Sequence, residues 1–139
     1  MKFRQEGNLI ILRLDKGEEI FSSTMAVCRS LNVHCGIISG LGAVSSCTMG
    51  VYDVEEKKYY QNEFKGAFEV TNLTGNVTTK DGECYLHIHI TLGDDKGSAF
   101  GGHLNEAIIS VTAEIFIQTF SLEVERKVDE AIGLNVLAI

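Results

Sequence analysis

The sequence contains no proline, and none of its apolar runs is long enough to cross a membrane. Without proline, turns must rest on the 14 glycines and on Asn and Asp, which reach positive φ more easily than other residues. A membrane helix needs about 18 to 20 apolar residues, and the N-terminus "MKFRQEGNLI" has no apolar stretch followed by a small-residue cleavage site. With 139 residues, 45% hydrophobic and 22% charged, the chain is expected to form one cytoplasmic domain over residues 1–139, without membrane association.

Basic residues are also scarce, because 12 Lys and Arg stand against 19 Asp and Glu and leave a net charge of -7. Such a chain repels polyanions at long range, which disfavours direct DNA binding. Two short cationic pairs, Lys57–Lys58 and Arg126–Lys127, adjoin glutamates. We interpret both pairs as solvated surface.

The four cysteines include no C-x-x-C pair, the spacing typical of zinc ribbons and redox motifs. In a reducing compartment, isolated cysteines are usually small buried apolar residues. Cys28, Cys35, Cys47 and Cys84 are therefore assigned to the core.

Hydrophobic periodicity predicts a strand at 8–14, then a helix within 15–32, then a sheet. In the helical segment Ile20, Thr24, Val27 and Leu31 recur at helical spacing. From residue 33 onward, short runs rich in β-branched and aromatic residues are broken by glycine or polar turns, as in antiparallel hairpins. Strands are expected at 36–38, 46–52, 58–63, 67–73, 75–79, 83–92, 106–111 and 112–120, with a last short strand at "NVLAI". The predicted class is α+β, an antiparallel meander with one main amphipathic helix packed on it.

Gly40 and Gly42 interrupt the strand-like run "ISGLGAVSS". A bulge or sharp bend is favoured here over a ligand-cradling loop, because phosphate-binding fingerprints need more glycines and a following helix.

Three of the four histidines lie in "LHIHITLGDDKGSAFGGHL". On a strand, His87 and His89 project from the same face about 6.6 Å apart and can converge on one ion. The segment after them is long enough to reverse direction and return His103, with Gly101 and Gly102 allowing close backbone approach. Three imidazoles are the ligand type of catalytic zinc sites, which keep a fourth position open. The alternative is a half-exposed sheet face with His103 in a loop.

A metal-dependent reaction would also need a carboxylate near the open position. Glu114 is the first candidate for a catalytic residue, because it lies inside the apolar run "VTAEIFIQTF", and Glu69 is the second. The alternative for both is a structural ion pair or hydrogen bond, with Arg13 as a partner for one of them. His34 is interpreted as a capping or surface residue.

Five blocks carry a resemblance to a known family: "LRLDKGEEI", "ISGLGAV", "GAFEVTNLTGNV", "LHIHITLGDDKGSAFGGHL" and "TAEIFI". Together they resemble the PPC domain, the plants-and-prokaryotes-conserved domain that follows AT-hook DNA-binding motifs in plants. The resemblance implies a compact domain with an antiparallel sheet, assembled as a homotrimer. It also implies a metal site, with zinc as the expected ion, at His87, His89 and His103. AT-hooks require proline, so no AT-hook is present here.

The fold and the ligand pattern are also similar to those of acetolactate decarboxylase, a zinc enzyme. Three hypotheses follow in order. The first is a cytoplasmic homotrimer with a zinc, or other divalent transition metal, that acts as a binding or regulatory module with a small-molecule ligand. The second is a metal-dependent lyase or hydrolase on a small carbonyl or acid substrate. The third, a protein that binds DNA by itself, is disfavoured by charge.

Overall fold

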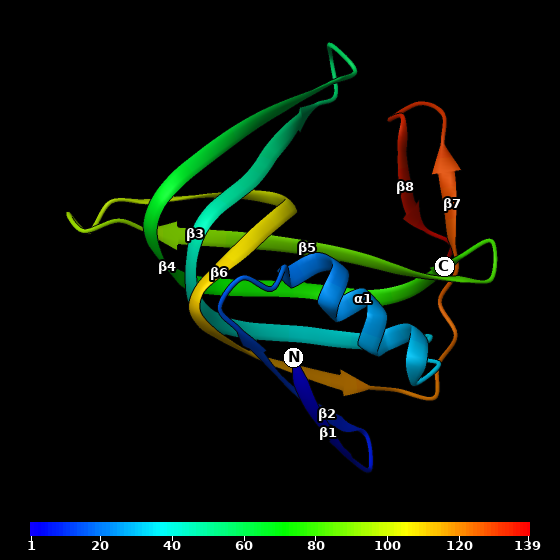
Figure 1. Ribbon diagram of the computed structural model, residues 1–139. Helices are drawn as coiled ribbons and strands as arrows, with labels where there is room; N and C mark the ends of the chain where they lie inside the picture. Colours follow the sequence, from blue (N-terminus) through cyan, green and yellow to red (C-terminus); the bar gives the residue numbers. More distant parts are fainter.

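The computed structural model describes residues 1–139 and shows a curved antiparallel sheet with one helix lying across it (Figure 1). The strands are β1 Lys2–Glu6, β2 Leu9–Asp15, β3 Gly36–Asp53, β4 Lys58–Lys80, β5 Glu83–Gly93, β6 Ala99–Thr119, β7 Arg126–Asp129 and β8 Leu134–Leu137. The helix α1 spans Ile20–Ser30. The expected α+β class is confirmed. No helix has the length and apolar character that a membrane crossing requires.

Strand β6 pairs with three other strands, β2, β3 and β5. The sheet has the order β1-β2-β6-β3-β4-β5, and β6 pairs with β5 as well. The C-terminal half of β6 runs beside β2, while its N-terminal end pairs with β5 from Ala99 to His103. The sheet therefore curls into a partly closed barrel, which Figure 1 shows as the strong bend of β3, β4 and β6.

Several strands predicted as separate are continuous, so their predicted ends were wrong. The expected strands 36–38 and 46–52 both belong to β3, the three between 58 and 79 belong to β4, and the two from 106 onward belong to β6. Register shifts interrupt these ladders without ending them, since a bulge bends a strand while the strand continues. Strands β1 and β7 were not predicted, and β8 overlaps the expected last strand.

The bulge expected at Gly40 and Gly42 is confirmed by a register shift between these two residues in the β3–β4 ladder. A Cβ atom added at Gly42 would lie 2.5 Å from the carbonyl oxygen of Thr112. Only glycine fits this close approach of β3 to β6, so the bend depends on it.

Helix α1 covers the apolar face of the sheet. Its N-cap is Glu19, whose carboxylate accepts hydrogen bonds from the backbone N–H groups of Phe21 and Ser22 at 2.7 and 2.5 Å, and of Ala107 on β6 at 3.1 Å. The Glu19 side chain therefore caps the N-terminus of α1 and also hydrogen-bonds to β6. The buried helix residues are Ile20, Thr24, Val27 and Cys28. Ile20, Val27 and Cys28 pack with the buried apolar residues of the strands in one core.

All four cysteines are free thiols. Cys28 and Cys47 are buried as expected, whereas Cys35 and Cys84 are only half-buried. The assignment of all four to the core was therefore half right.

A C-terminal hairpin, formed by β7 and β8, stands apart from the main sheet (Figure 1). The chain leaves β6 and returns to β4, where the backbone N–H of Thr79 donates to the carbonyl of Val124 at 2.9 Å. The far end of the hairpin reaches β3, where the Tyr52 hydroxyl donates to the carbonyl of Ile132 at 3.1 Å. The hairpin therefore bridges two distant parts of the sheet and leaves a hollow beneath it.

Candidate metal centre

Strand β5 places His87 and His89 on the face opposite the core. The intervening residues Leu86, Ile88 and Ile90 are buried against the core. This alternation is the strand phase that the sequence predicted. His103 reaches the same place from β6, where it pairs directly with His89 on one side and with Gly50 of β3 on the other.

The three imidazole rings converge. Their centroids are 5.1 Å apart for His87 and His89, 5.1 Å for His87 and His103, and 5.6 Å for His89 and His103. One ring nitrogen from each residue lies within 4.8 Å of the others, and the Nε2 atoms of His87 and His89 are 3.2 Å apart. Three nitrogens about 2.0 to 2.1 Å from one zinc ion at tetrahedral angles would be about 3.4 Å apart. The arrangement therefore fits a divalent metal after small side-chain rotations.

Burial keeps two of the imidazoles, those of His87 and His103, in the neutral form that ligates metals. The pKa of His87 falls to about 4, first because its ring is partly desolvated and then because His103, Arg126 and His89 would repel a second positive charge. Burial and His89 also lower the pKa of His103. Both rings are therefore neutral at pH 7, with a nitrogen lone pair free for a ligand bond.

Glycines allow the strands to meet closely around His103. A Cβ at Gly102 would lie 2.7 Å from the carbonyl oxygen of Gly50, and a Cβ at Gly101 would lie 2.6 Å from that of Ile90. The close backbone approach expected at Gly101 and Gly102 is thus confirmed. Beside them, the Tyr59 hydroxyl donates to the side-chain oxygen of Asn105 at 2.6 Å, and the Tyr59 ring is nearly perpendicular to that of His103, with 6.2 Å between the centroids.

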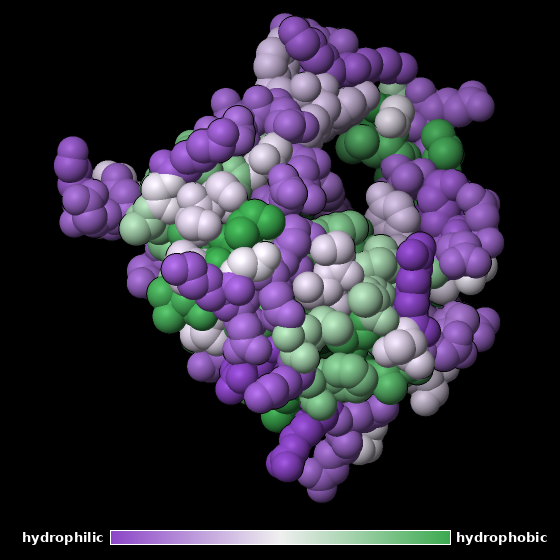
Figure 2. Space-filling view, in the orientation of Figure 1, coloured by the Kyte–Doolittle hydropathy of each residue, from purple (hydrophilic) through white to green (hydrophobic).

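His87, His89 and His103 line a pocket of about 560 Å³ under the C-terminal hairpin. Figure 2 shows this hollow between the body of the sheet and the hairpin. Val51 of β3, Val128 of β7 and Leu134 of β8 give it apolar walls, and no Asp or Glu lines it. The cluster is therefore accessible to a small molecule.

Arg126 of β7 also lines this pocket, although it was not predicted as a site residue. The pair Arg126–Lys127 was interpreted as solvated surface, but Arg126 is only 6% exposed, whereas Lys127 is exposed. The strand alternation of β7 turns the two side chains to opposite sides. Four strand residues within a charged segment gave no periodic signal from which this burial could be inferred.

The two candidate carboxylates lie elsewhere in the chain. Glu114 is exposed on β6, opposite Arg13 and Leu41 in the ladders, and eleven residues along the strand from His103. Glu69 is exposed on β4, opposite Ala43 and Gly93. Neither lines the histidine pocket, so one chain does not bring a predicted carboxylate to the cluster. Arg13 forms its ion pair with Asp15 at 3.0 Å and not with either glutamate.

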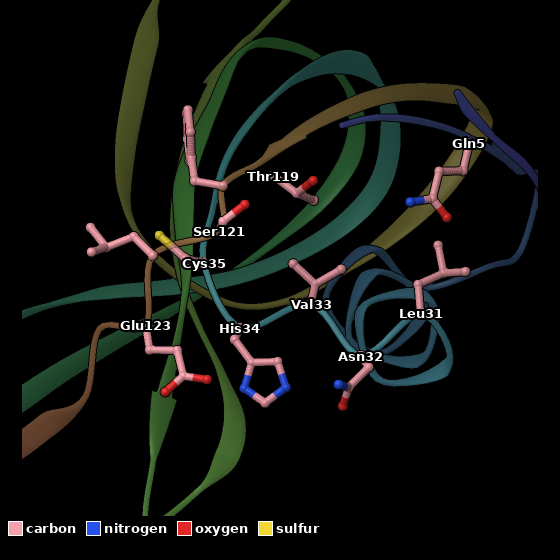
Figure 3. Close-up of a pocket in the computed structure, with 11 residues that line it drawn as sticks. Gln5, Leu31, Asn32, Val33, His34, Cys35, Thr119, Ser121 and Glu123 are labelled. Carbon is pink, nitrogen blue, oxygen red and sulfur yellow. The ribbon is translucent and has the colours of Figure 1, made fainter. Parts of the chain in front are cut away.

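His34 lies outside the cluster. It follows the helix three residues after the C-cap Leu31, so it does not cap α1, and it is half-buried. With Cys35 and Glu123 it lines a separate, polar pocket of about 260 Å³ (Figure 3). The structure thus separates this histidine from the other three.

Residues 1–121 match the model of the Plants and Prokaryotes Conserved domain, abbreviated PCC or PPC. The chain belongs to this family. The matched residues contain the three clustered histidines, whereas the PPC match ends before Arg126 and the C-terminal hairpin.

Solved structures of similar chains share the fold over nearly the whole length. A metal-containing protein of Archaeoglobus fulgidus is 37% identical, with all of both chains covered and a TM-score of 0.89. A candidate DNA-binding protein of Bacteroides thetaiotaomicron is 31% identical over 98% of this chain and 95% of that chain, with a TM-score of 0.95.

A more distant structure connects this fold with that of a decarboxylase relative. A Staphylococcus aureus protein described as similar to α-acetolactate decarboxylase is 14% identical, with 83% of this chain and 53% of that chain covered and a TM-score of 0.60. The expected likeness of fold is therefore confirmed, and it concerns the fold alone.

Among curated proteins, the bifunctional protein GlmU of Synechococcus sp. strain JA-3-3Ab is 29% identical over 131 residues. These cover 92% of this chain and 20% of that protein, so the PPC chain spans about a fifth of the curated relatives that it matches.

Proposed function

We propose that this PPC protein is a homotrimer that holds a divalent transition metal, zinc first, and acts as a binding or regulatory module for a small molecule. The convergence of His87, His89 and His103 at the floor of one pocket is the observation that carries the proposal. When bound, the metal would supply a Lewis-acidic centre with an open coordination position. The metal-containing relative of 37% identity supports a metal here, while imidazole ligands alone suit several divalent ions.

Metal content tests the site. Untagged wild-type protein should carry about one equivalent of metal per chain by elemental mass spectrometry, or take up one equivalent of Zn²⁺ at neutral pH. The double variant His87→Ala/His89→Ala should lose it. His34→Ala is the matched control, because it removes a histidine outside the cluster and should leave the metal in place. No uptake by the wild type, or equal uptake by the double variant, contradicts the metal site.

The homotrimer is supported by apolar side chains on the outer face of the sheet. Ile11 and Phe116 are cross-strand partners that are 41% and 42% exposed, and Ile37 and Leu41 on the neighbouring β3 are 54% and 55% exposed. Burial of such a patch against other copies would remove apolar surface from water. Light scattering should give about three times the 15.2 kDa of one chain, and a monomeric mass would contradict this part of the proposal.

A second candidate function is a zinc-dependent lyase or hydrolase acting on a small carbonyl or acid substrate. The open pocket around the cluster favours it, because catalytic sites leave room for substrate beside the metal. In that case Glu114 or Glu69 could transfer protons only from a neighbouring subunit, since neither lines the pocket of its own chain. Turnover of small carbonyl acids by zinc-loaded protein, lost in Glu114→Gln or Glu69→Gln with metal retained, would favour this function.

Direct binding to duplex DNA is not part of the proposal, although the Bacteroides relative is described as a candidate DNA-binding protein. The net charge of -7 per chain opposes contact with phosphates. We expect no salt-dependent change in the fluorescence anisotropy of a labelled duplex, and a change that disappears as salt is raised would overturn this expectation.

A further inference from the structure

Arg126 is a buried cation whose hydrogen-bond partners are all neutral. Its Nε donates to the Thr78 hydroxyl at 2.8 Å, one Nη donates to the Asn135 carbonyl at 3.0 Å, and the other donates to the Asn76 side-chain oxygen at 2.9 Å. The guanidinium has five N–H donors, so these bonds leave two of them available. The three bonds fix the orientation of the guanidinium.

No carboxylate compensates this charge. None of the ion pairs in the chain includes Arg126, and the pocket that it lines contains no Asp or Glu. Arginine stays protonated in proteins, and buried charges are ordinarily paired with an opposite charge. A cation at 6% exposure, facing a pocket, therefore points to an anion supplied from outside the chain.

The guanidinium lies beside the histidine cluster. Asn76, which accepts one of its bonds, is the direct cross-strand partner of His87. Tyr85 lies on the same face of β5 two residues before His87, and the Arg126 guanidinium sits over its ring at 4.8 Å. Directly opposite residues on antiparallel strands have Cβ atoms about 4.5 to 5.5 Å apart. Arg126 and the cluster thus face one pocket from adjacent positions.

We infer that this pocket binds a small organic carboxylate with an apolar body, whose carboxylate is held by Arg126 beside the metal site. The inference rests on the proposed metal function, because the histidines supply the second positive centre only when they hold an ion. Guanidinium and carboxylate match in geometry and form strong charge-assisted bonds. The apolar walls and the single arginine suit a carboxylate better than a phosphate, for which the pocket offers no lysine.

Isothermal titration calorimetry on zinc-loaded protein tests the inference with three probes. Benzoate and acetate carry the carboxylate, with a large and a small apolar body respectively, and benzamide is a neutral analogue of benzoate. Benzoate should bind once per chain and more tightly than acetate, and benzamide should bind at least about 10-fold more weakly than benzoate.

Substitutions assign the effect to Arg126. Arg126→Gln should weaken carboxylate binding by at least about 10-fold, and Arg126→Lys should restore part of it, because it keeps the charge without the fork of donors. Lys127→Gln is the matched control, since it removes one positive charge from the same strand at an exposed position. It should bind the carboxylate as the wild type does. Thermal unfolding and metal content of each variant show that it is folded and loaded.

The failures of the two proposals are distinguishable. A wild-type chain that takes up no metal overturns the proposed function and the inference together. A metal-loaded wild type that does not bind benzoate, binds acetate as tightly as benzoate, or binds benzamide as tightly as benzoate overturns only the inference. Equal carboxylate affinity in folded Arg126→Gln and wild type also overturns it, whereas the metal site stands.

Discussion

The two faces of β5 carry opposite kinds of side chain. Ile88 and Ile90 point into the core and are at most 1% exposed, whereas His87 and His89 point into the pocket. Because side chains alternate along a strand, the apolar contacts that hold β5 in register also fix where the imidazoles point. One face of β5 therefore packs the core, and the other presents the candidate metal ligands.

Truncation of the apolar face should have the largest effect on stability. Ile88→Ala removes three carbon atoms from a fully buried position, so the free energy of unfolding should fall by about 2 to 5 kcal/mol. Urea unfolding of metal-free protein at one fixed chain concentration measures this loss. The folded fraction should still bind about one equivalent of metal, and a loss below about 1 kcal/mol would show that the face does not hold the strand.

The pocket face should contribute stability only through metal. Zinc at 100 times its dissociation constant should raise the free energy of unfolding of the wild type by about 2.7 kcal/mol, and this gain should vanish in His89→Ala. Without metal, the free energy of unfolding of His89→Ala should be within about 0.5 kcal/mol of the wild-type value, because the His89 side chain is exposed. A large loss in metal-free His89→Ala would mean that this face is structural after all.

A substitution at Gly102, where β6 approaches β3 closely, should lower both the stability and the metal affinity. Gly102→Ala places a Cβ 2.7 Å from the Gly50 carbonyl oxygen, and a backbone atom cannot rotate away as a side chain can. The free energy of unfolding should therefore fall by about 1 to 3 kcal/mol, and the affinity for zinc should fall as well. Gly93→Ala is the milder comparison, since its Cβ would meet only the Thr71 side-chain methyl at 3.1 Å. Equal effects of the two substitutions on unfolding and zinc titration would argue against the close approach.

Glu114→Gln should have the smallest effect. In the separated chain the Glu114 side chain is exposed, and Arg13 forms its ion pair with Asp15 instead. At a chain concentration low enough to give monomers, the free energy of unfolding should therefore change by less than about 0.5 kcal/mol. Metal content should stay at the wild-type value. A change in zinc affinity would place Glu114 near a cluster of a neighbouring chain.

Local patterns predicted the features that depend on neighbouring residues. The alternation of β5 was readable because apolar and polar residues alternate over one short segment, and the helix was readable from the spacing of Ile20, Thr24 and Val27. The spacing H-x-H with a later histidine predicted a cluster, because a reversal of the chain must bring the third ring back. The division of β3 was mistaken because a bulge at Gly40 and Gly42 has the same glycine-rich local composition as a turn.

The α+β class, the single helix and the three clustered histidines follow from periodicity and residue spacing along the chain. The continuation of β3, β4 and β6 through their bends, and the cover that the C-terminal hairpin forms over the histidines, depend on contacts between distant segments. Only the tertiary structure turned Arg126 inward, because the contacts that bury this residue come from Thr78, Asn76 and Asn135. Two of these lie about fifty residues away on β4, and no local pattern encodes a contact between segments so distant in the chain.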